Sequence, residues 1–110
     1  MPFDDPEQSS AKILYHDCSE EVQCEAYQNL RPMVLEGLAG SVVYAGWVDV
    51  PVTCIVCELD RAFPAWYQRE LINGLGVEVE VESLNSSHSP FLSMPKKLTE
   101  VVLKIAKGRD

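Results

Sequence analysis

Asp60 and His88 have the side chains of an acid and base pair, and each is expected to follow a strand. Asp60 lies three residues after the apolar run Val52–Cys57. His88 lies in the polar loop after the alternating segment Val77–Glu82. Catalytic groups gather beyond the carboxyl ends of parallel strands, so we expect the two side chains to meet there. A carboxylate bound to one imidazole nitrogen leaves the other nitrogen free to take a proton from a hydroxyl, which predicts the acid and base of a catalytic triad.

The nucleophile that this pair would serve is missing from the sequence. A serine nucleophile of this kind stands in a Gly-x-Ser-x-Gly turn between a strand and a helix. No such turn occurs in the 110 residues. Ser41 follows Gly37 and Gly40, but these glycines stand at the wrong positions and no strand is expected before them. Because hydrolysis needs a nucleophile and oxyanion donors, we expect the isolated chain to have no esterase activity.

The other reactive side chains are expected to be structural. Cys54 and Cys57 have the spacing Cys-x-x-Cys, but residues three apart in a strand point to opposite faces. No second cysteine pair or histidine cluster completes a tetrahedral site, so we expect no metal and no cofactor. The glutamates of the segment 77–82 are interpreted as the solvated face of a strand. His16 does not follow a strand, and we interpret it as an ordinary cap or surface histidine.

The second half of the chain has the alternating pattern of an α/β fold. Val52–Cys57 is a continuous apolar and β-branched run, typical of a strand that is covered on both faces. Pro64–Asn73 is predicted to be a helix, and the strict alternation of Val77–Glu82 predicts a half-exposed strand. A last helix is expected from Ser93 onward, with apolar residues at helical spacing at Leu98, Val101, Val102 and Ile105. The predicted order is β-α-β-α.

The first half of the chain has mainly helix signals. Asp17–Glu21 offers N-cap side chains and first-turn acids for a helix that Pro32 ends. A second short helix is expected over Met33–Leu38. We therefore divide the chain into a helical segment, residues 1–48, and an α/β segment, residues 49–110.

The two predicted strands make an incomplete sheet. A parallel strand that is apolar on both faces needs helices above and below it and a strand on each side, and an isolated pair of strands is only marginally stable in water. We therefore expect the chain to be part of a larger sheet, or to associate with another chain through an unpaired sheet edge.

Composition and charge exclude several classes of partner. The formal net charge is −8, with 17 acidic and 9 basic residues, so phosphate backbones and anionic lipids would repel the chain. We expect no nucleic-acid partner and no membrane partner. The start Met1–Glu7 has neither the basic flank nor the apolar stretch of a signal peptide, and cysteines are few, so we expect a cytoplasmic protein with reduced thiols.

Two segments resemble a known family. Pro51–Gln68 resembles the acid-bearing strand and turn of small-molecule α/β-hydrolases, above all the methylesterase and hydroxynitrile lyase group and related microbial hydrolases. Ser87–Leu98 is similar to their histidine loop and last helix, and Leu14–Glu21 is similar to the start of their helical cap. The resemblance implies that residues 49–110 are the C-terminal part of the hydrolase core and that residues 1–48 are part of a cap.

The resemblance also implies a function. Asp60 would be the triad acid and His88 the triad base of a serine hydrolase that acts on a small apolar ester-like substrate. The cap would shape an apolar pocket, for which the candidate lining residues are Met33, Trp47, Phe63 and Phe91. Three possibilities stay open: a C-terminal portion of such an enzyme, an inactive remnant that binds a ligand or partner, and a subunit completed in trans. Lyase chemistry in the complete enzyme is also open.

Overall fold

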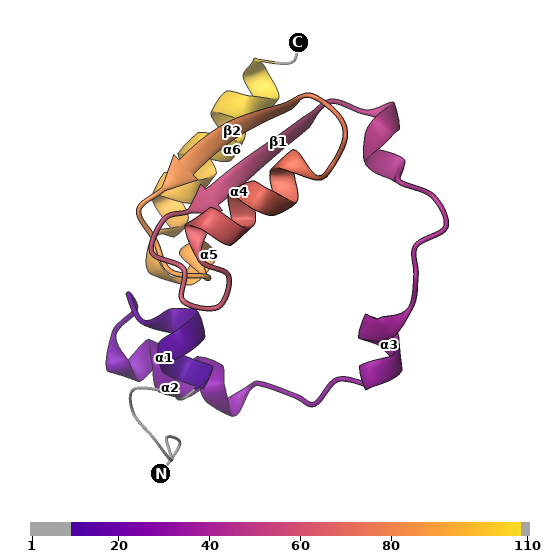
Figure 1. The fold of residues 1–110 in the computed structure, drawn as a ribbon. Helices are drawn as coiled ribbons and strands as arrows, with labels where there is room; N and C mark the ends of the chain where they lie inside the picture. Colours follow the sequence, from indigo (N-terminus) through magenta and orange to yellow (C-terminus); the bar gives the residue numbers. More distant parts are fainter. Residues whose placement is uncertain (1–9, 109–110) are drawn as a thin grey trace.

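The structure, a computed structural model, describes residues 10–108. The order of elements confirms the predicted β-α-β-α second half, preceded by short helices (Figure 1). The elements are α1 (Ser10–Tyr15), α2 (Glu20–Gln28), α3 (Leu35–Ala39), the 3-10 helix η1 (Gly46–Asp49), β1 (Val52–Cys57), α4 (Ala65–Asn73), β2 (Val79–Leu84), α5 (Pro90–Ser93) and α6 (Pro95–Lys107).

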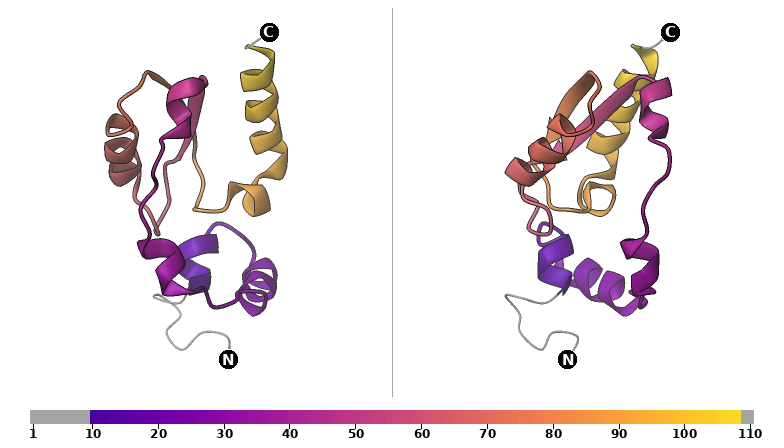
Figure 2. Two further views of the ribbon diagram at one scale, coloured as in Figure 1. Left: turned by 90° about the vertical axis from the view of Figure 1, so that its right-hand side faces the viewer. Right: turned by 45° about the vertical axis from the view of Figure 1, so that its right-hand side comes forward.

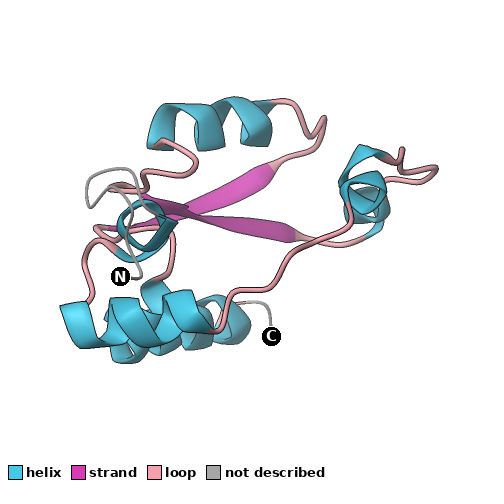
Figure 3. Ribbon diagram, turned by 90° about the horizontal axis from the view of Figure 1, so that it is seen from below, coloured by secondary structure: helices cyan, strands magenta, loops and turns pink. Residues whose placement is uncertain are grey.

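The sheet consists of β1 and β2, which run parallel with Val52 opposite Val79 and Cys57 opposite Leu84. Helix α4 covers one face of the sheet and α6 the other, so the second half has three layers (Figures 2 and 3). Val56 in β1 is fully buried, and Leu84 at the end of β2 is almost so. The described part of the sheet has no third strand, which agrees with the expected incomplete sheet.

Proline and glycine set the ends of the helices around the sheet. Pro64 stands directly before α4, and Pro95 opens α6, where a missing N–H costs no helical hydrogen bond. The N–H of Gly74 bonds to Glu70 O and closes α4. Gly76 then turns the chain toward β2 with a positive φ of 73°. β2 begins at Val79, two residues later than the alternating pattern predicted.

The glutamate face of the segment 77–82 is solvated at Glu78 and Glu80, as the sequence predicted, but not at Glu82. Glu82 is half-buried, and its Oε1 accepts a hydrogen bond from Lys104 Nζ of α6 at 2.8 Å. On the valine face, Val79 is half-buried and Val81 is 49% exposed. Helix α6 reaches the glutamate face through Lys104, whereas α4 lies mainly against β1.

The first half forms two separate parts. Helices α1 and α2 pack on each other beyond the carboxyl ends of the strands (Figure 1). The chain from α2 to β1 then runs wide of the sheet, and Val43 in it is 100% exposed. Helix α2 ends at Gln28, earlier than the expected end at Pro32, because the backbone and side chain of Asn29 bond to the last carbonyls. Residues 1–9 of the expected cap segment lie outside the described residues.

No helix within residues 10–108 is both long and apolar enough to cross a membrane.

Candidate active site

Asp60 is held in a turn directly after β1. Its Oδ1 accepts hydrogen bonds from the backbone N–H groups of Ala62 at 2.8 Å and Phe63 at 2.9 Å. An aspartate that bonds the backbone two and three residues ahead forms its own tight turn. Only 4% of the Asp60 side chain is exposed. The carboxylate is therefore fixed and largely dry, and its second oxygen points out of the turn.

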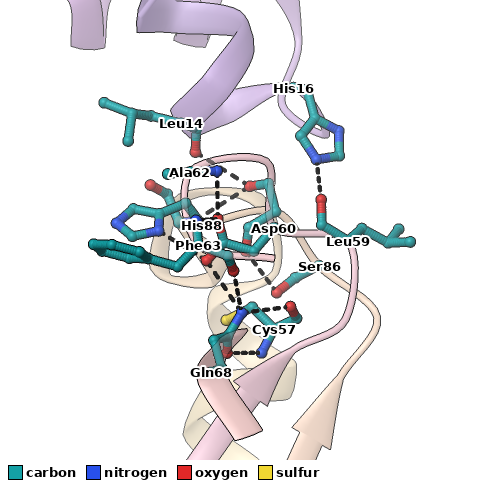
Figure 4. A network of polar contacts seen from close by, with 12 residues as sticks. Leu14, His16, Cys57, Leu59, Asp60, Ala62, Phe63, Gln68, Ser86 and His88 are labelled. Carbon is teal, nitrogen blue, oxygen red and sulfur yellow. Dashed lines mark hydrogen bonds and ion pairs between the residues drawn. The ribbon is translucent and has the colours of Figure 1, made fainter. Parts of the chain in front are cut away.

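His88 meets that second oxygen. Its Nδ1 lies 2.8 Å from Asp60 Oδ2, so the structure brings the two predicted residues together (Figure 4). A carboxylate can only accept, so this contact favours the tautomer with the proton on Nδ1. About a third of the His88 side chain is exposed, 33%, which keeps the ring reachable while its partner is buried. The arrangement can hold an imidazole in the orientation that proton transfer needs.

Gln68 of α4 ties the acid turn to the end of β1. Its Nε2 donates to Cys57 O at 3.0 Å, to Phe63 O at 2.7 Å and, more weakly, to Asp60 Oδ2 at 3.4 Å. Its Oε1 accepts from Cys57 N at 2.9 Å. Gln68 ends the segment 51–68 that resembles the acid-bearing strand and turn, but no role for it was predicted. No local signal marks this role, because the partners of Gln68 lie in β1 and the acid turn.

The backbone ladder holds the acid and histidine loops side by side beyond the strand ends. Glu58 N bonds to Leu84 O at 2.8 Å, and Leu59 N bonds to Ser86 O at 3.0 Å. Three serines of the histidine loop, Ser86, Ser87 and Ser89, are buried. The hydroxyl of Ser86 donates to Ser87 O at 3.0 Å, and that of Ser87 accepts from Ser89 N at 3.2 Å. The histidine therefore stands on a packed loop.

The residues just after α1 touch both loops. His16 Nε2 lies 2.6 Å from Leu59 O, so this histidine joins α1 to the acid loop (Figure 4). Asp17 Oδ2 accepts from Ser87 N at 2.9 Å. Asp17 was predicted to be among the N-cap residues, but Ser19 is the N-cap of α2, and its Oγ accepts a hydrogen bond from Val22 N at 3.2 Å. Asp17 is free to face the histidine loop because the cap is already occupied.

The pKa of Asp17 is lowered from its ordinary value. Burial alone would raise this pKa, but hydrogen bonds from Ser87 and Ser93 outweigh burial by stabilising the carboxylate. Burial raises the pKa of the neighbouring Cys18 thiol, and so does the negative charge of Asp17. Cys57 also has a raised pKa, mainly through burial. Both thiols are poor nucleophiles in this environment.

The structure separates the four expected pocket residues. The ring of Phe63 lies 5.6 Å from the ring of His88, measured between centroids, and Phe91 lies in α5, which follows the histidine loop. Met33 is 72% exposed in the segment between α2 and α3. Trp47 is not near the pair: it precedes β1, and its Nε1 bonds to Leu75 O at 3.0 Å, before β2. Trp47 and Leu75 therefore both lie at the amino ends of the strands.

A cavity of about 420 Å³ lies between α1, α2 and α5, and none of the four expected pocket residues lines it. Its apolar lining comes from α2, the residues just after α2, α1 and α5: Val22, Ala26, Leu30, Tyr15 and Leu92. The described residues contain no cluster of histidine, cysteine and acidic side chains that could hold a metal ion.

The model of the alpha/beta hydrolase family matches residues 3–101. The chain belongs to this family. Among its relatives, norfluorocurarine synthase 2 of Strychnos nux-vomica is 32% identical over 99 residues, which are 86% of this chain and 37% of that protein. Methylesterase 7 of Arabidopsis thaliana is 34% identical over 77 residues, which are 68% of this chain and 30% of that protein. The resemblance to the methylesterase group is confirmed.

The fold agrees with that of a solved family member. The crystal structure of polyneuridine aldehyde esterase matches with a TM-score of 0.72 and 25% identity, over 87% of this chain and 39% of that chain. This chain therefore spans about two fifths of the length of such relatives, 37% of one and 39% of another. The two-stranded sheet is the corresponding part of a larger alpha/beta hydrolase sheet.

Proposed function

We propose that this chain supplies the acid, Asp60, and the base, His88, of a serine hydrolase that acts on small-molecule carboxylic esters. The observation that carries the proposal is the 2.8 Å contact between His88 Nδ1 and a carboxylate whose side chain is 4% exposed, beyond the ends of parallel strands. The nucleophilic serine and the oxyanion donors would come from the part of the fold that this chain does not contain.

The geometry supports the following proton path. With the Nδ1 proton held by Asp60, His88 Nε2 takes the proton of the serine hydroxyl as that oxygen attacks the ester carbonyl. The imidazolium then protonates the leaving alkoxide as the acyl-enzyme forms. Water gives a proton to His88 Nε2, attacks the acyl-enzyme and releases the carboxylic acid, and His88 returns the proton to the serine. Asp60 stays ionised, with Ala62 N and Phe63 N on its Oδ1, and stabilises the imidazolium.

The choice of an ester substrate rests on site chemistry together with the relatives. Relatives of this chain carry the names methylesterase, aldehyde esterase and synthase. An acid and base pair of this kind serves acyl transfer directly, which favours the esterases. Phe63 beside His88 would form an apolar wall for the substrate, and Phe91 and Met33 stay candidates for the pocket of the complete enzyme. Trp47 does not, because it lies at the other end of the sheet.

The missing strands can belong to the same polypeptide or to a second chain. β1 and β2 pair only with each other in the described residues, so a sheet edge is open to either source. A cytoplasmic location, which was predicted from sequence, is part of the same proposal.

The test compares this chain alone with a joined protein, in which the part of Methylesterase 7 outside the matched region is fused to this chain. With a chromogenic aryl ester, we expect no enzymatic turnover from the chain alone and turnover from the joined protein. We expect His88→Ala to abolish that turnover. Turnover by the chain alone that disappears in His88→Ala would contradict the missing nucleophile, and turnover by the joined protein that survives His88→Ala would overturn the role of the base.

A further inference from the structure

The segment that follows α1 contacts both loops of the acid and base pair. His16 Nε2 reaches Leu59 O, the neighbour of Asp60, across 43 positions of the sequence. Asp17 Oδ2 accepts a hydrogen bond from the backbone N–H of Ser87, the neighbour of His88, across 70 positions of the sequence. Figure 4 shows how close α1 comes to the two loops. Asp17 therefore contacts the residue directly before the base His88, although the two lie far apart in the sequence.

The Asp17 contact fixes the backbone on which His88 stands. Ser87 is fully buried, so its N–H would lose its partner, and solvent could not replace it, if Asp17 were absent. The Ser87 hydroxyl adds a contact with Leu14 O at 3.4 Å and accepts from Ser89 N at 3.2 Å. Ser87 is therefore linked to α1 and to the segment after it, and Ser89, on the other side of His88, is linked to them through Ser87.

We propose that Asp17 is a positioning residue for His88: its carboxylate holds Ser87 N and thereby keeps His88 Nδ1 on Asp60. Asp17 acts through Ser87 and does not touch the reacting atoms. The inference deepens the proposed function and rests on it, since the orientation of His88 matters for a base.

The ionised state of Asp17 supports this role. Its pKa is lowered because hydrogen bonds from Ser87 and Ser93 outweigh the effect of burial, so the side chain is a carboxylate at neutral pH. Hydrogen bonds to a charged acceptor are stronger than neutral ones. The rival role, capping α2, is already filled by Ser19.

The experiment is imidazole ¹⁵N and ¹H NMR on the full 110-residue chain, which has only two histidines to assign. In the unaltered chain we expect His88 to be protonated on Nδ1, with a slowly exchanging downfield Hδ1 resonance. In Asp17→Asn, where the amide oxygen can still accept Ser87 N, we expect faster Hδ1 exchange. In Asp17→Ala we expect loss of the resonance.

The matched control is Asp49→Ala. Asp49 is likewise an aspartate that accepts a hydrogen bond, from the Tyr44 hydroxyl at 2.7 Å, but it precedes β1 and lies at the opposite end of the sheet. We expect no change in the His88 spectrum of this variant. Far-UV circular dichroism checks that each variant is folded, and if Asp17→Ala is not, Asp17→Asn decides alone.

The outcomes separate this inference from the proposed function. An unaltered chain without the Nδ1 proton on His88 would overturn the pair itself and both proposals with it. A normal unaltered spectrum together with unchanged Hδ1 exchange in the Asp17 variants would overturn only the role of Asp17.

Discussion

Asp60 obtains its orientation from its own turn as much as from its partner. Oδ1 is used by the N–H groups of Ala62 and Phe63, which leaves Oδ2 as the oxygen that faces His88. The backbone thus decides which oxygen serves the base. Because the two oxygens have different partners, their roles can be tested separately: an amide can replace one of them and not the other.

Asp60→Asn is expected to keep the turn and lose the acid. The amide oxygen can take the two backbone N–H groups, but the NH₂ group then faces His88 Nδ1 and selects the wrong tautomer. In the joined protein we expect kcat to fall by about 10⁴-fold, as is found when the acid of a serine triad becomes an amide. The control Asp49→Asn, at the far end of the sheet, should leave kcat unchanged. An Asp60→Asn enzyme with normal kcat would contradict the assigned role.

Gln68 is expected to contribute to stability by satisfying several backbone groups at once. Gln68→Leu leaves Cys57 N and the carbonyls of Cys57 and Phe63 without their amide partner. We expect a loss of about 2 kcal/mol in the free energy of unfolding, measured with urea. The control Gln28→Leu, on the exposed surface of α2, should change it by less than about 0.5 kcal/mol. Equal effects of the two substitutions would show that the Gln68 contacts add nothing.

The lowered pKa of Asp17 predicts how the free energy of unfolding depends on pH. Its pKa is lowered from 3.8 in the folded chain, so its contribution is fully present above pH 3.8 and is lost as the pH falls through the lowered folded value. Asp17→Asn removes this contribution. The urea midpoint of the unaltered chain should therefore fall more steeply on acidification below pH 4 than that of Asp17→Asn. Parallel curves for the two proteins would contradict the lowered pKa.

Among the elements, local signals predicted the strand β1 and the helices α4 and α6, because apolar periodicity and proline or glycine ends are encoded within each segment. The apolar stripe of α6 was predicted slightly too wide, since Val102 is 49% exposed. Asp60 and His88 could be predicted because each follows its own strand. Asp17 and Gln68 could not, because their partners come from other elements and a polar residue carries no periodicity.

The turn between α4 and β2 depends on a single backbone conformation. Gly76 has φ 73°, and a Cβ added there would have nothing within 4 Å, so only the backbone strain of a side chain matters. Gly76→Ala should therefore lower the free energy of unfolding by about 1–2 kcal/mol. Gly46→Ala is the control, because its Cβ also has open space and its φ is not positive. The measurement is urea unfolding of both variants. Equal midpoints for the two would contradict the left-handed turn.

At the scale of the whole molecule, the chain is more extended than a compact domain of the same length. The radius of gyration is 16.0 Å, whereas a compact domain of this length is expected to have about 13 Å. The excess comes from the wide path between α2 and β1, where Val42 and Val43 are 78% and 100% exposed. Polyneuridine aldehyde esterase contains about 2.2 times as much chain, since 87% of this chain covers 39% of that one. In the complete hydrolase that we propose, the rest of the fold would cover these side chains and the open sheet edge.

Val43→Lys tests this view, because its effect should differ between two contexts. In the chain alone Val43 is fully exposed, so lysine should change the free energy of unfolding by less than about 0.5 kcal/mol. In the joined protein, where the rest of the fold covers this stretch, the same charge would be buried without a partner, and we expect a loss of about 2–3 kcal/mol.

Leu103→Lys is the matched control for that comparison. Leu103 is 51% exposed in α6 and lies outside the predicted apolar stripe, so lysine should be neutral in both proteins. Urea unfolding of the four variants gives the answer. A Val43→Lys effect that is equally small in both proteins would mean that this stretch stays in solvent in the complete fold, and that its exposure in the chain alone does not mark a missing interface.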